Sequence, residues 1–197
     1  MSISLTVAII AGGKSRRFGS PKALAEFHGK RLIDHAVSLA QQLSENVFVC
    51  CGSAPLPLDS SIQQLPDLFQ NCGPIGGLHA AFESCETERI AIIPCDMPLV
   101  TANIYKTLLE NDKHDQPVVA VSERGVQPLV SIWPVSARGS IELQMATKRY
   151  GLHALLKHLD AIEVVFNTAV AERQFRNVNT LADLRAIDDS NFTHETS

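Results

Sequence analysis

The sequence predicts an α/β protein in which helices cover both faces of a mostly parallel sheet, giving three layers. Short β-rich runs alternate with helical patterns through the first half of the chain, and the first run, Leu5–Ala11, is almost wholly apolar. It stops at Gly12-Gly13. Such runs are typical of central parallel strands, because crossover helices bury both faces of the sheet. The β-α-β-α-β order of the first half implies right-handed crossovers.

The other elements of the first half follow from their patterns. Apolar residues with helical spacing predict amphipathic helices, and Thr101 is a plausible N-cap. In chain order we expect a helix at 31–43, a strand at 46–51, a helix at 75–84, a strand at 89–94 and a helix at 101–111.

The second half is less regular. A hairpin is indicated around Glu123-Arg124-Gly125, with strands at 117–122 and 126–133. Thr180 and Asp183 stand at capping-box spacing at the start of the last helix. The expected elements here are helices at 141–146 and 151–159, a strand at 162–166 and a helix at 180–187. We therefore expect a single domain over residues 1–187 and a polar, frayed tail at 188–197.

Composition excludes several classes of protein. The chain has 197 residues, of which 45% are hydrophobic and 19% charged, enough to bury a full core. We see no targeting signal and no run of about 20 apolar residues, so we expect a cytoplasmic protein with no membrane partner. The five cysteines contain no C-x-x-C pair and are expected to be reduced thiols. A net charge of −4 argues against binding to nucleic acid.

Positive charge is concentrated near the N-terminus. Residues 1–31 contain six Lys or Arg and one Glu, so this segment is basic although the whole chain is acidic. A local basic cluster on an acidic protein indicates a site for a small anion.

The glycine loop after the first strand is the first candidate site. Ligands of open α/β sheets bind beyond the carboxyl ends of the strands, and Gly12-Gly13 would let backbone N–H groups approach a phosphate. Arg16 or Arg17 can bind phosphate oxygens in bidentate fashion, and Lys22 adds a movable charge. The loop matches neither a Walker A motif nor G-x-G-x-x-G. The alternative is a turn with solvated basic side chains.

Pro94-Cys95-Asp96-Met97-Pro98 is the second candidate. Asp96 directly follows a buried strand and should lie on the same rim of the sheet as the glycine loop. Mg²⁺ is typically held by one or two carboxylates together with substrate phosphates and water. Asp96 is therefore the expected metal ligand, and its alternative role is to cap the next turn.

Two further segments are compatible with binding. Asp67, followed by the glycine-rich turn Gly73-Pro74-Ile75-Gly76-Gly77, would suit close approach of a base or ribose to the backbone. A tight turn at a helix start explains the same pattern. Asn177-Val178-Asn179-Thr180 places two amides before a helix, where Asx-turn chemistry is the alternative.

These motifs carry a resemblance to a known family. Ala11-Gly12-Gly13-x-Ser15-x-Arg17-x-Gly19-x-x-Lys22 resembles the signature loop of nucleotidyltransferases with the nucleotide-diphospho-sugar transferase fold. The order of this loop, the Gly-Pro-x-x-Gly turn, Cys-Asp-Met-Pro and Asn-x-Asn-Thr is similar to the molybdenum cofactor guanylyltransferases. The likeness extends from Val7 to about Leu184.

The resemblance implies a Rossmann-like nucleotide-binding N-terminal half and a set of site residues. Nucleotide (GTP) would be bound by Ile10, Ala11, Gly12, Gly13, Lys22, Cys50, Asp67, Gly73, Gly77 and Asp96. Mg²⁺ would lie on Asp96, and Lys22, Asp96 and Arg17 would be the catalytic residues. At Cys50 the chain departs from the family, which often has Asn there, and a thiol is the poorer hydrogen-bond partner.

The implied reaction is transfer of GMP from GTP to the terminal phosphate of molybdopterin, with release of pyrophosphate. Extended backbone at 177–179 would point the amides of Asn177 and Asn179 to one side, opposite a buried Val178. Paired amides suit the edge of a pterin ring, so we expect them to bind the acceptor. Molybdoenzymes or cofactor-delivery proteins are the expected partner proteins.

Three alternatives are open at this point. Within the same class, the enzyme would use CTP or a different phosphorylated acceptor. A non-catalytic nucleotide sensor or cofactor chaperone would have no need of Asp96. A dinucleotide-binding oxidoreductase would need G-x-G-x-x-G and an acid after the second strand, where the chain has Cys50-Cys51.

Overall fold

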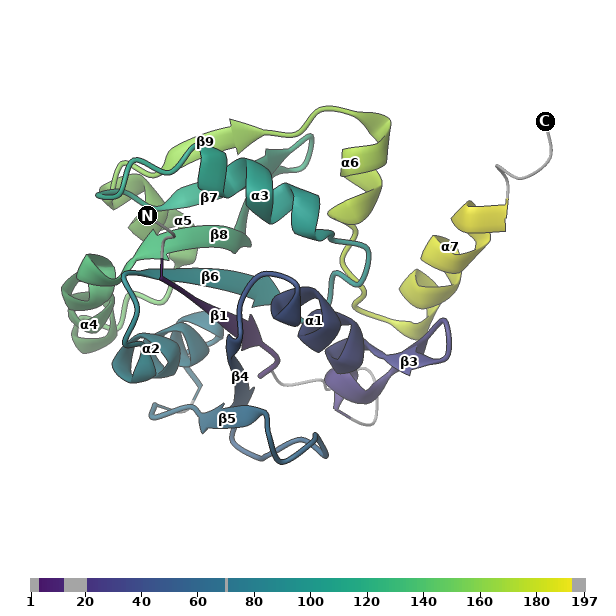
Figure 1. The fold of residues 1–197 in the computed structure, drawn as a ribbon, viewed down its shortest axis with the longest axis horizontal. Helices are drawn as coiled ribbons and strands as arrows, with labels where there is room; N and C mark the ends of the chain where they lie inside the picture. The colour runs from purple at the N-terminus through teal and green to yellow at the C-terminus, as the bar shows by residue number, and fades with distance from the viewer. Residues whose placement is uncertain (1–3, 13–20, 70, 193–197) are drawn as a thin grey trace.

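The computed structural model describes residues 4–12, 21–69 and 71–192, and its centre is a seven-stranded sheet (Figure 1). The strand order is β5-β4-β1-β6-β8-β7-β9. All neighbours are parallel except those of β8, which runs antiparallel to β6 and β7. The strands are β1 (Leu5–Ile10), β4 (Asn46–Gly52), β5 (Gln63–Pro66), β6 (Arg89–Pro94), β7 (Val118–Ser122), β8 (Gly125–Pro134) and β9 (Ile162–Val165).

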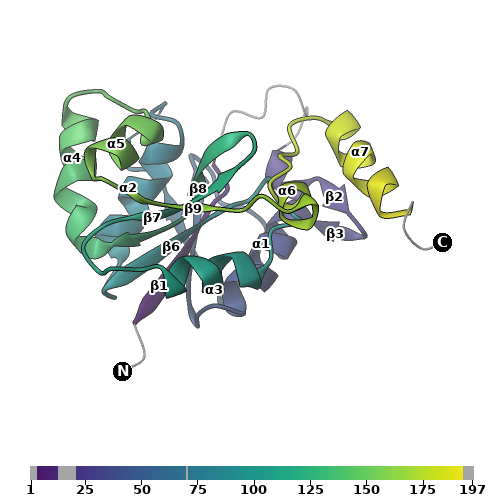
Figure 2. The ribbon, with the colours of Figure 1, turned by 90° about the horizontal axis from the view of Figure 1, so that it is seen from above.

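Helices cover both faces of this sheet (Figure 2). One hydrophobic core forms between the sheet and α1 and α3, and a second forms between the sheet and α2, α4 and α5. The predicted three-layer α/β/α fold with a mostly parallel sheet is therefore confirmed. The helices are α1 (Leu32–Gln41), α2 (Pro74–Ser84), α3 (Ala102–Glu110), α4 (Arg138–Ala146), α5 (Leu152–His158), α6 (Ala169–Gln174) and α7 (Leu181–Phe192).

Several short elements were not predicted. They are the 3-10 helices η1 (Lys22–Leu24) and η2 (Val135–Ala137), the small hairpin of β2 (Glu26–Phe27) and β3 (Lys30–Arg31), the strand β5 and the helix α6. Each has six residues or fewer, too few for a hydrophobic period to show.

One boundary prediction was wrong: helix α7 continues to Phe192, so residues 188–192 are helical where we expected a frayed tail. Thr101 is the N-cap residue of α3, as predicted, but its side chain makes no capping hydrogen bond. Its hydroxyl instead donates to Oε1 of Gln174 at 2.9 Å, which ties the start of α3 to α6. The division into one domain at 1–187 and a tail stays a prediction.

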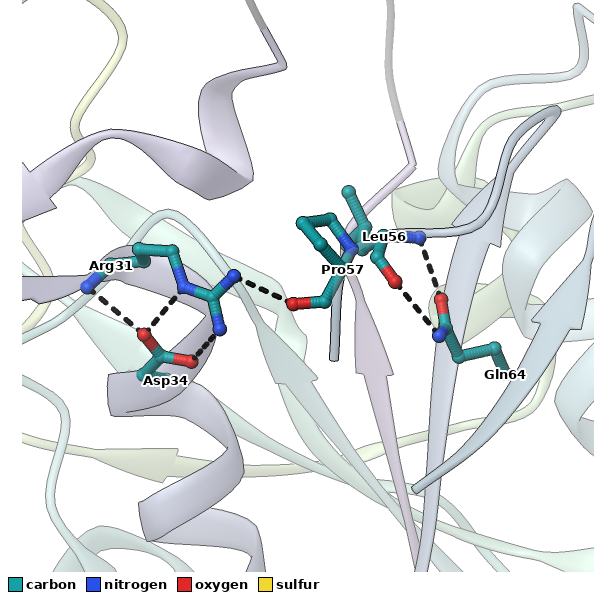
Figure 3. Close-up of polar contacts among 5 residues, drawn as sticks. All are labelled: Arg31, Asp34, Leu56, Pro57 and Gln64. Carbon is teal, nitrogen blue, oxygen red and sulfur yellow. Dashed lines mark hydrogen bonds and ion pairs between the residues drawn. The ribbon is translucent and has the colours of Figure 1, made fainter. Parts of the chain in front are cut away.

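Arg31 belongs to the basic N-terminal segment, but its contacts are structural (Figure 3). Its Nε donates to Oδ2 of Asp34 at 2.7 Å and its Nη1 donates to the Pro57 carbonyl at 2.7 Å. The guanidinium lowers the pKa of the Asp34 carboxyl, chiefly through this side-chain hydrogen bonding. The side chain of Gln64 exchanges two hydrogen bonds with the backbone of Leu56, at 2.7 and 2.9 Å. The loop between β4 and β5 is thus bonded to Arg31, just before α1, at one point and to β5 at another.

A buried ion pair joins the start of β6 to the residues after α3. Nε of Arg89 donates to Oδ2 of Asp112 at 2.6 Å, and the two side chains are 3% and 1% exposed. Oδ1 of Asp112 also accepts from the His114 backbone at 3.0 Å. This pair lies at the amino end of β6, opposite the rim where that strand delivers Asp96. Within the described ranges, no helix is long and apolar enough to cross a membrane.

Candidate active site

The carboxyl ends of β1, β4 and β6 meet and are joined by backbone hydrogen bonds. The amides of Ala11 and Gly12 both donate to the carbonyl of Cys50, at 3.0 and 2.9 Å. The amide of Cys95 donates to the carbonyl of Ile10 at 3.2 Å. The predicted common rim therefore exists, since the start of the glycine loop is bonded to the end of β4 and the segment that carries Asp96 is bonded to the end of β1.

Gly12 lies against a second glycine on this rim. A Cβ atom on Gly12 would be 2.9 Å from both Cα and N of Gly52 at the end of β4. These are backbone atoms, so a side chain at Gly12 would force the two loops apart. The sequence led us to expect that Gly12 lets a ligand approach the backbone. In the structure, Gly12 lets the backbones at the ends of β1 and β4 approach each other.

We expect Gly12→Ala to destabilise the protein by about 1–3 kcal/mol, because the added methyl overlaps backbone that cannot turn away. Gly139→Ala is the matched control, since a Cβ at this position in α4 meets nothing within 4 Å. Alanine also favours the helix, so the control should melt at or above the wild-type temperature. Equal melting temperatures for the two variants would contradict the close contact.

Asp67 borders the start of α2. Its amide donates to the carbonyl of Gly52 at 2.8 Å. A Cβ on Gly76 would be 3.2 Å from its Oδ2, and a Cβ on Gly77 would be 3.0 Å from Cβ of Cys50. The two glycines thus let the helix approach both Asp67 and the end of β4. Burial raises the pKa of the Asp67 carboxyl.

Helix α2 begins as its sequence predicts. Gly73 adopts φ 71°, in the left-handed region that glycine tolerates best, and Pro74 follows at the first turn, where its missing N–H costs nothing. The Gly-Pro pair therefore sets the entry into α2, and the first helical turn places Gly76 and Gly77 toward the rim.

Lys22 is the centre of the polar network on the rim. Its Nζ donates to Oδ2 of Asp96 at 2.8 Å and to Oδ1 of Asn179 at 2.8 Å. The side chains of Lys22 and Asp96 are 19% and 29% exposed, so the ion pair is largely shielded from solvent. Residues from the beginning, middle and end of the chain therefore converge on one ammonium group.

The segment with two amides is fixed beside Asp96 by its backbone. The amide of Val178 donates to the carbonyl of Asp96 at 2.8 Å, and the amide of Asn179 donates to Oδ2 of Asp183 at 2.7 Å. The latter bond is the main cause of a lowered pKa at Asp183. The hydroxyl of Thr180 accepts from the amide of Asp183 at 3.1 Å, as in a capping box. Asn177 and Asn179 are exposed and Val178 is buried, the alternation that we predicted.

The oxygens around Lys22 fit a divalent cation such as Mg²⁺. Asp96 and Asn179 supply one carboxylate and one amide oxygen, and both already bind a single positive charge, the ammonium of Lys22. Hard oxygen ligands of this kind are the ones that Mg²⁺ prefers. No cluster of three or more His, Cys, Asp or Glu is present among the residues that the structure describes. A magnesium ion held by the oxygens of Asp96 and Asn179 would take its other ligands from phosphate and water.

The structure brings most of the predicted site residues together. Lys22, Asp96 and Asn179 are in direct contact, whereas Ile10, Ala11, Gly12, Cys50, Asp67 and Gly77 form the adjoining rim. Gly73 precedes α2, and Asn177 lies two residues before Asn179. Gly13 and Arg17 lie outside the described residues.

Cys50 is buried, and burial raises the pKa of its thiol. Its carbonyl is already bonded to the amides of Ala11 and Gly12, so the backbone of Cys50 fixes the start of the glycine loop. This supporting role was not predicted from the sequence, and neither were the contacts of Gly52 and Asp183. The sequence signal for the contact of Gly52 was the presence of a glycine directly after the predicted strand at 46–51. The sequence paired Asp183 with Thr180 alone, in a capping box, whereas the structure shows that the carboxylate of Asp183 also accepts from the amide of Asn179.

Comparison with known proteins agrees with this arrangement. Residues 7–163 match the family described as MobA-like NTP transferase domain. A relative from Geobacillus sp. (strain WCH70), named "Probable molybdenum cofactor guanylyltransferase", is 32% identical over 183 residues, covering 87% of this chain and 92% of the relative.

Two solved structures are also similar. A protein from Aquifex aeolicus VF5 is 26% identical with a TM-score of 0.76, covering 90% of this chain and 94% of its own. Molybdopterin-guanine dinucleotide biosynthesis protein A from Archaeoglobus fulgidus has a TM-score of 0.74 at 20% identity, covering 94% of this chain and 98% of its own, a likeness of fold. The chain is a nucleotidyltransferase and belongs to the MobA-like NTP transferase domain family.

Proposed function

We propose that the protein transfers GMP from GTP to the terminal phosphate of molybdopterin, forming the guanine dinucleotide cofactor and releasing pyrophosphate. The observation that carries this proposal is the contact of Lys22 with Asp96 and Asn179 beside the glycine rim. One carboxylate, one amide and one cation at the carboxyl ends of parallel strands suit a phosphate-bound metal. The name of the Geobacillus relative supports guanine and the molybdenum cofactor as the substrates.

The reaction needs little acid–base help from the protein. An ionised oxygen of the terminal phosphate of molybdopterin attacks the α-phosphorus of GTP, and the bond from that phosphorus to the bridging oxygen of the β-phosphate breaks. A phosphate monoester already carries negative charge near neutral pH, so no strong general base is required. Catalysis then rests on positioning and on neutralising the charge of the leaving pyrophosphate.

Each part of the rim has a role in this scheme. The glycine loop at Gly12-Gly13 would offer the backbone N–H of Gly13 to the phosphates, since that of Gly12 is bonded to Cys50. Lys22 and Arg17 neutralise the phosphates, and Asp67 with Gly73 and Gly77 borders the nucleoside. Asp96, with the amide oxygen of Asn179 beside it, would hold Mg²⁺. Bound there, Mg²⁺ would supply electrostatic stabilisation of phosphate charge.

The acceptor side is assigned by position. Asn177 is exposed and near Asp96, so it is the stronger candidate for contact with the pterin. The amide oxygen of Asn179 accepts from Lys22, which supports a role for Asn179 nearer the phosphates. The dinucleotide product would pass to molybdoenzymes, directly or through delivery proteins.

The direct test is a comparison of GTP, CTP and ATP as donors, with molybdopterin present and pyrophosphate release as the signal. We expect GTP to give the highest rate, with release that depends on the acceptor and on Mg²⁺. Preferred turnover of CTP would transfer the assignment to a cytidylyl enzyme. Binding of GTP without release, when intact acceptor is supplied, would favour a cofactor chaperone.

A pair of lysines separates a phosphate site from general surface charge. Lys22→Ala should weaken GTP binding about tenfold or more, because a charge-assisted contact contributes about 1.5–3 kcal/mol. Lys30→Ala should change it by no more than a few fold, since Lys30 is exposed on β3. Titration calorimetry with GTP and Mg²⁺ measures both. Losses of equal size would indicate a diffuse field and no specific contact at Lys22.

A further inference from the structure

We infer that Lys22 is an exchangeable internal cation, which fills the metal position between Asp96 and Asn179 until a triphosphate draws it away. Divalent cation and nucleotide would then bind as a pair, and neither would bind well alone. The inference rests on the proposed function and extends it, because it assigns Lys22 a role before any substrate arrives. It starts from one observation, the 2.8 Å contacts of a single ammonium with Asp96 and with Asn179.

The backbone positions that carry the two oxygens are held in place independently of Lys22. The backbone of Asp96 is bonded to Val178 at 2.8 Å, and the backbone of Asn179 is bonded to Asp183 at 2.7 Å. Withdrawal of the lysine would therefore leave a carboxylate and an amide oxygen in register for another cation. The cation position is formed by residues of the rim, and the ammonium of Lys22 is one of the cations that can fill it.

Lys22 itself is well suited to leave. It is the first residue of the short helix η1, which follows the glycine loop in the sequence, and its charge is carried on a flexible four-carbon chain. The phosphate oxygens of a triphosphate bound on this rim would offer the ammonium new partners of higher charge. Movement of the Lys22 side chain alone would then transfer its ammonium from Asp96 to the phosphates of the nucleotide.

Competition for the same oxygens couples the two ligands. A metal ion that arrives alone must displace the ammonium from Asp96 or bind beside a like charge, and the ion pair is largely shielded, with side chains 19% and 29% exposed. Nucleotide removes this obstacle, and the metal in turn frees Lys22 for the phosphates. Such coupling is reciprocal, so each ligand should tighten the other by the same factor.

The test measures Mn²⁺ binding by the loss of its free electron paramagnetic resonance signal. Mn²⁺ is added alone or with a GTP analogue that has a methylene group between the α- and β-phosphorus atoms, and the Mn²⁺ that the analogue binds in protein-free samples is subtracted. Wild-type protein should bind Mn²⁺ at least about fivefold more tightly with the analogue than without it. In Lys22→Met the affinity for Mn²⁺ alone should rise about five- to tenfold, while binding in the presence of the analogue weakens.

Two matched variants isolate the charge. Lys22→Arg keeps a cation at the position, so its affinity for Mn²⁺ alone should stay near the wild-type value. Lys30→Met removes a lysine from exposed β3 and should leave both affinities unchanged. Opposite changes for metal alone and metal with nucleotide, seen in Lys22→Met and in neither control, are the expected pattern.

The inference is overturned if Lys22→Met binds Mn²⁺ alone no more tightly than wild type does. Wild-type protein provides an independent test should that variant fail to fold, because equal Mn²⁺ affinity with and without the analogue excludes the exchange. Failure of the proposed function looks different. Donor selectivity for CTP would refute it even with cation exchange intact, whereas GTP turnover without coupling would refute the exchange alone.

Discussion

Asp96→Asn should reduce turnover about a hundredfold or more, equivalent to about 3 kcal/mol of lost transition-state stabilisation. The substitution removes the carboxylate charge that binds the ammonium of Lys22 while preserving the size of the side chain. The backbone carbonyl at this position still accepts from Val178, so the fold should be retained. Pyrophosphate release at saturating GTP and acceptor, over a range of Mg²⁺ concentrations, is the measurement.

Asp115→Asn is the control for charge removal. Asp115 is exposed and precedes β7, so it lies at the rim opposite Asp96 in this parallel arrangement. Its rate should equal that of wild type. A rate for Asp96→Asn within a few fold of wild type, with the same dependence on Mg²⁺, would remove Asp96 from the metal site.

Asp112→Ala should cause the largest loss of stability, about 3–5 kcal/mol, because it leaves the buried guanidinium of Arg89 without its countercharge. For a protein of this size the melting temperature should fall by on the order of 10 °C. Differential scanning calorimetry measures the change. Turnover assayed well below the transition should be nearly normal, since the pair lies at the far end of β6 from Asp96.

The double variant Arg89→Met with Asp112→Leu separates an uncompensated charge from lost packing. Replacing both partners of a buried pair by apolar residues is often neutral or stabilising, so most of the loss should be recovered. A double variant as unstable as Asp112→Ala would mean that packing around Asp112, and not the unpaired charge, causes the loss.

The sequence was sufficient for the central strands and the main helices because these are long and periodic. β1 and β6 are buried at every position, and α1 has a clear apolar stripe. Strand order was harder. The hairpin of β7 and β8 was predicted, but its insertion so that β8 pairs with β6 depends on contacts distant in sequence. Local pattern carries no information about such pairing.

The site was predictable where chemistry and strand ends coincide, as at Gly12 and Asp96. The site was less predictable where the role of a residue depends on a contact with another residue that is distant in the sequence. Asn179 was expected to face the acceptor, yet its amide oxygen contacts Lys22, a partner that only the folded chain can bring near. Cys50 is buried and its carbonyl accepts from Ala11 and Gly12, a supporting contact that no local pattern in the sequence predicts, and its contact with the nucleotide stays a prediction.

The bond between Lys22 and Asn179 spans 157 positions, and this has a consequence for how the enzyme is made in the cell. A nascent chain on the ribosome can pair β1, β4 and β6 long before Asn179 is synthesised. It can therefore bury its first core early, yet it lacks the amide oxygen that contacts Lys22 until Asn179 has been synthesised. Premature termination before Val178 should release a chain that folds in part and cannot complete its active site.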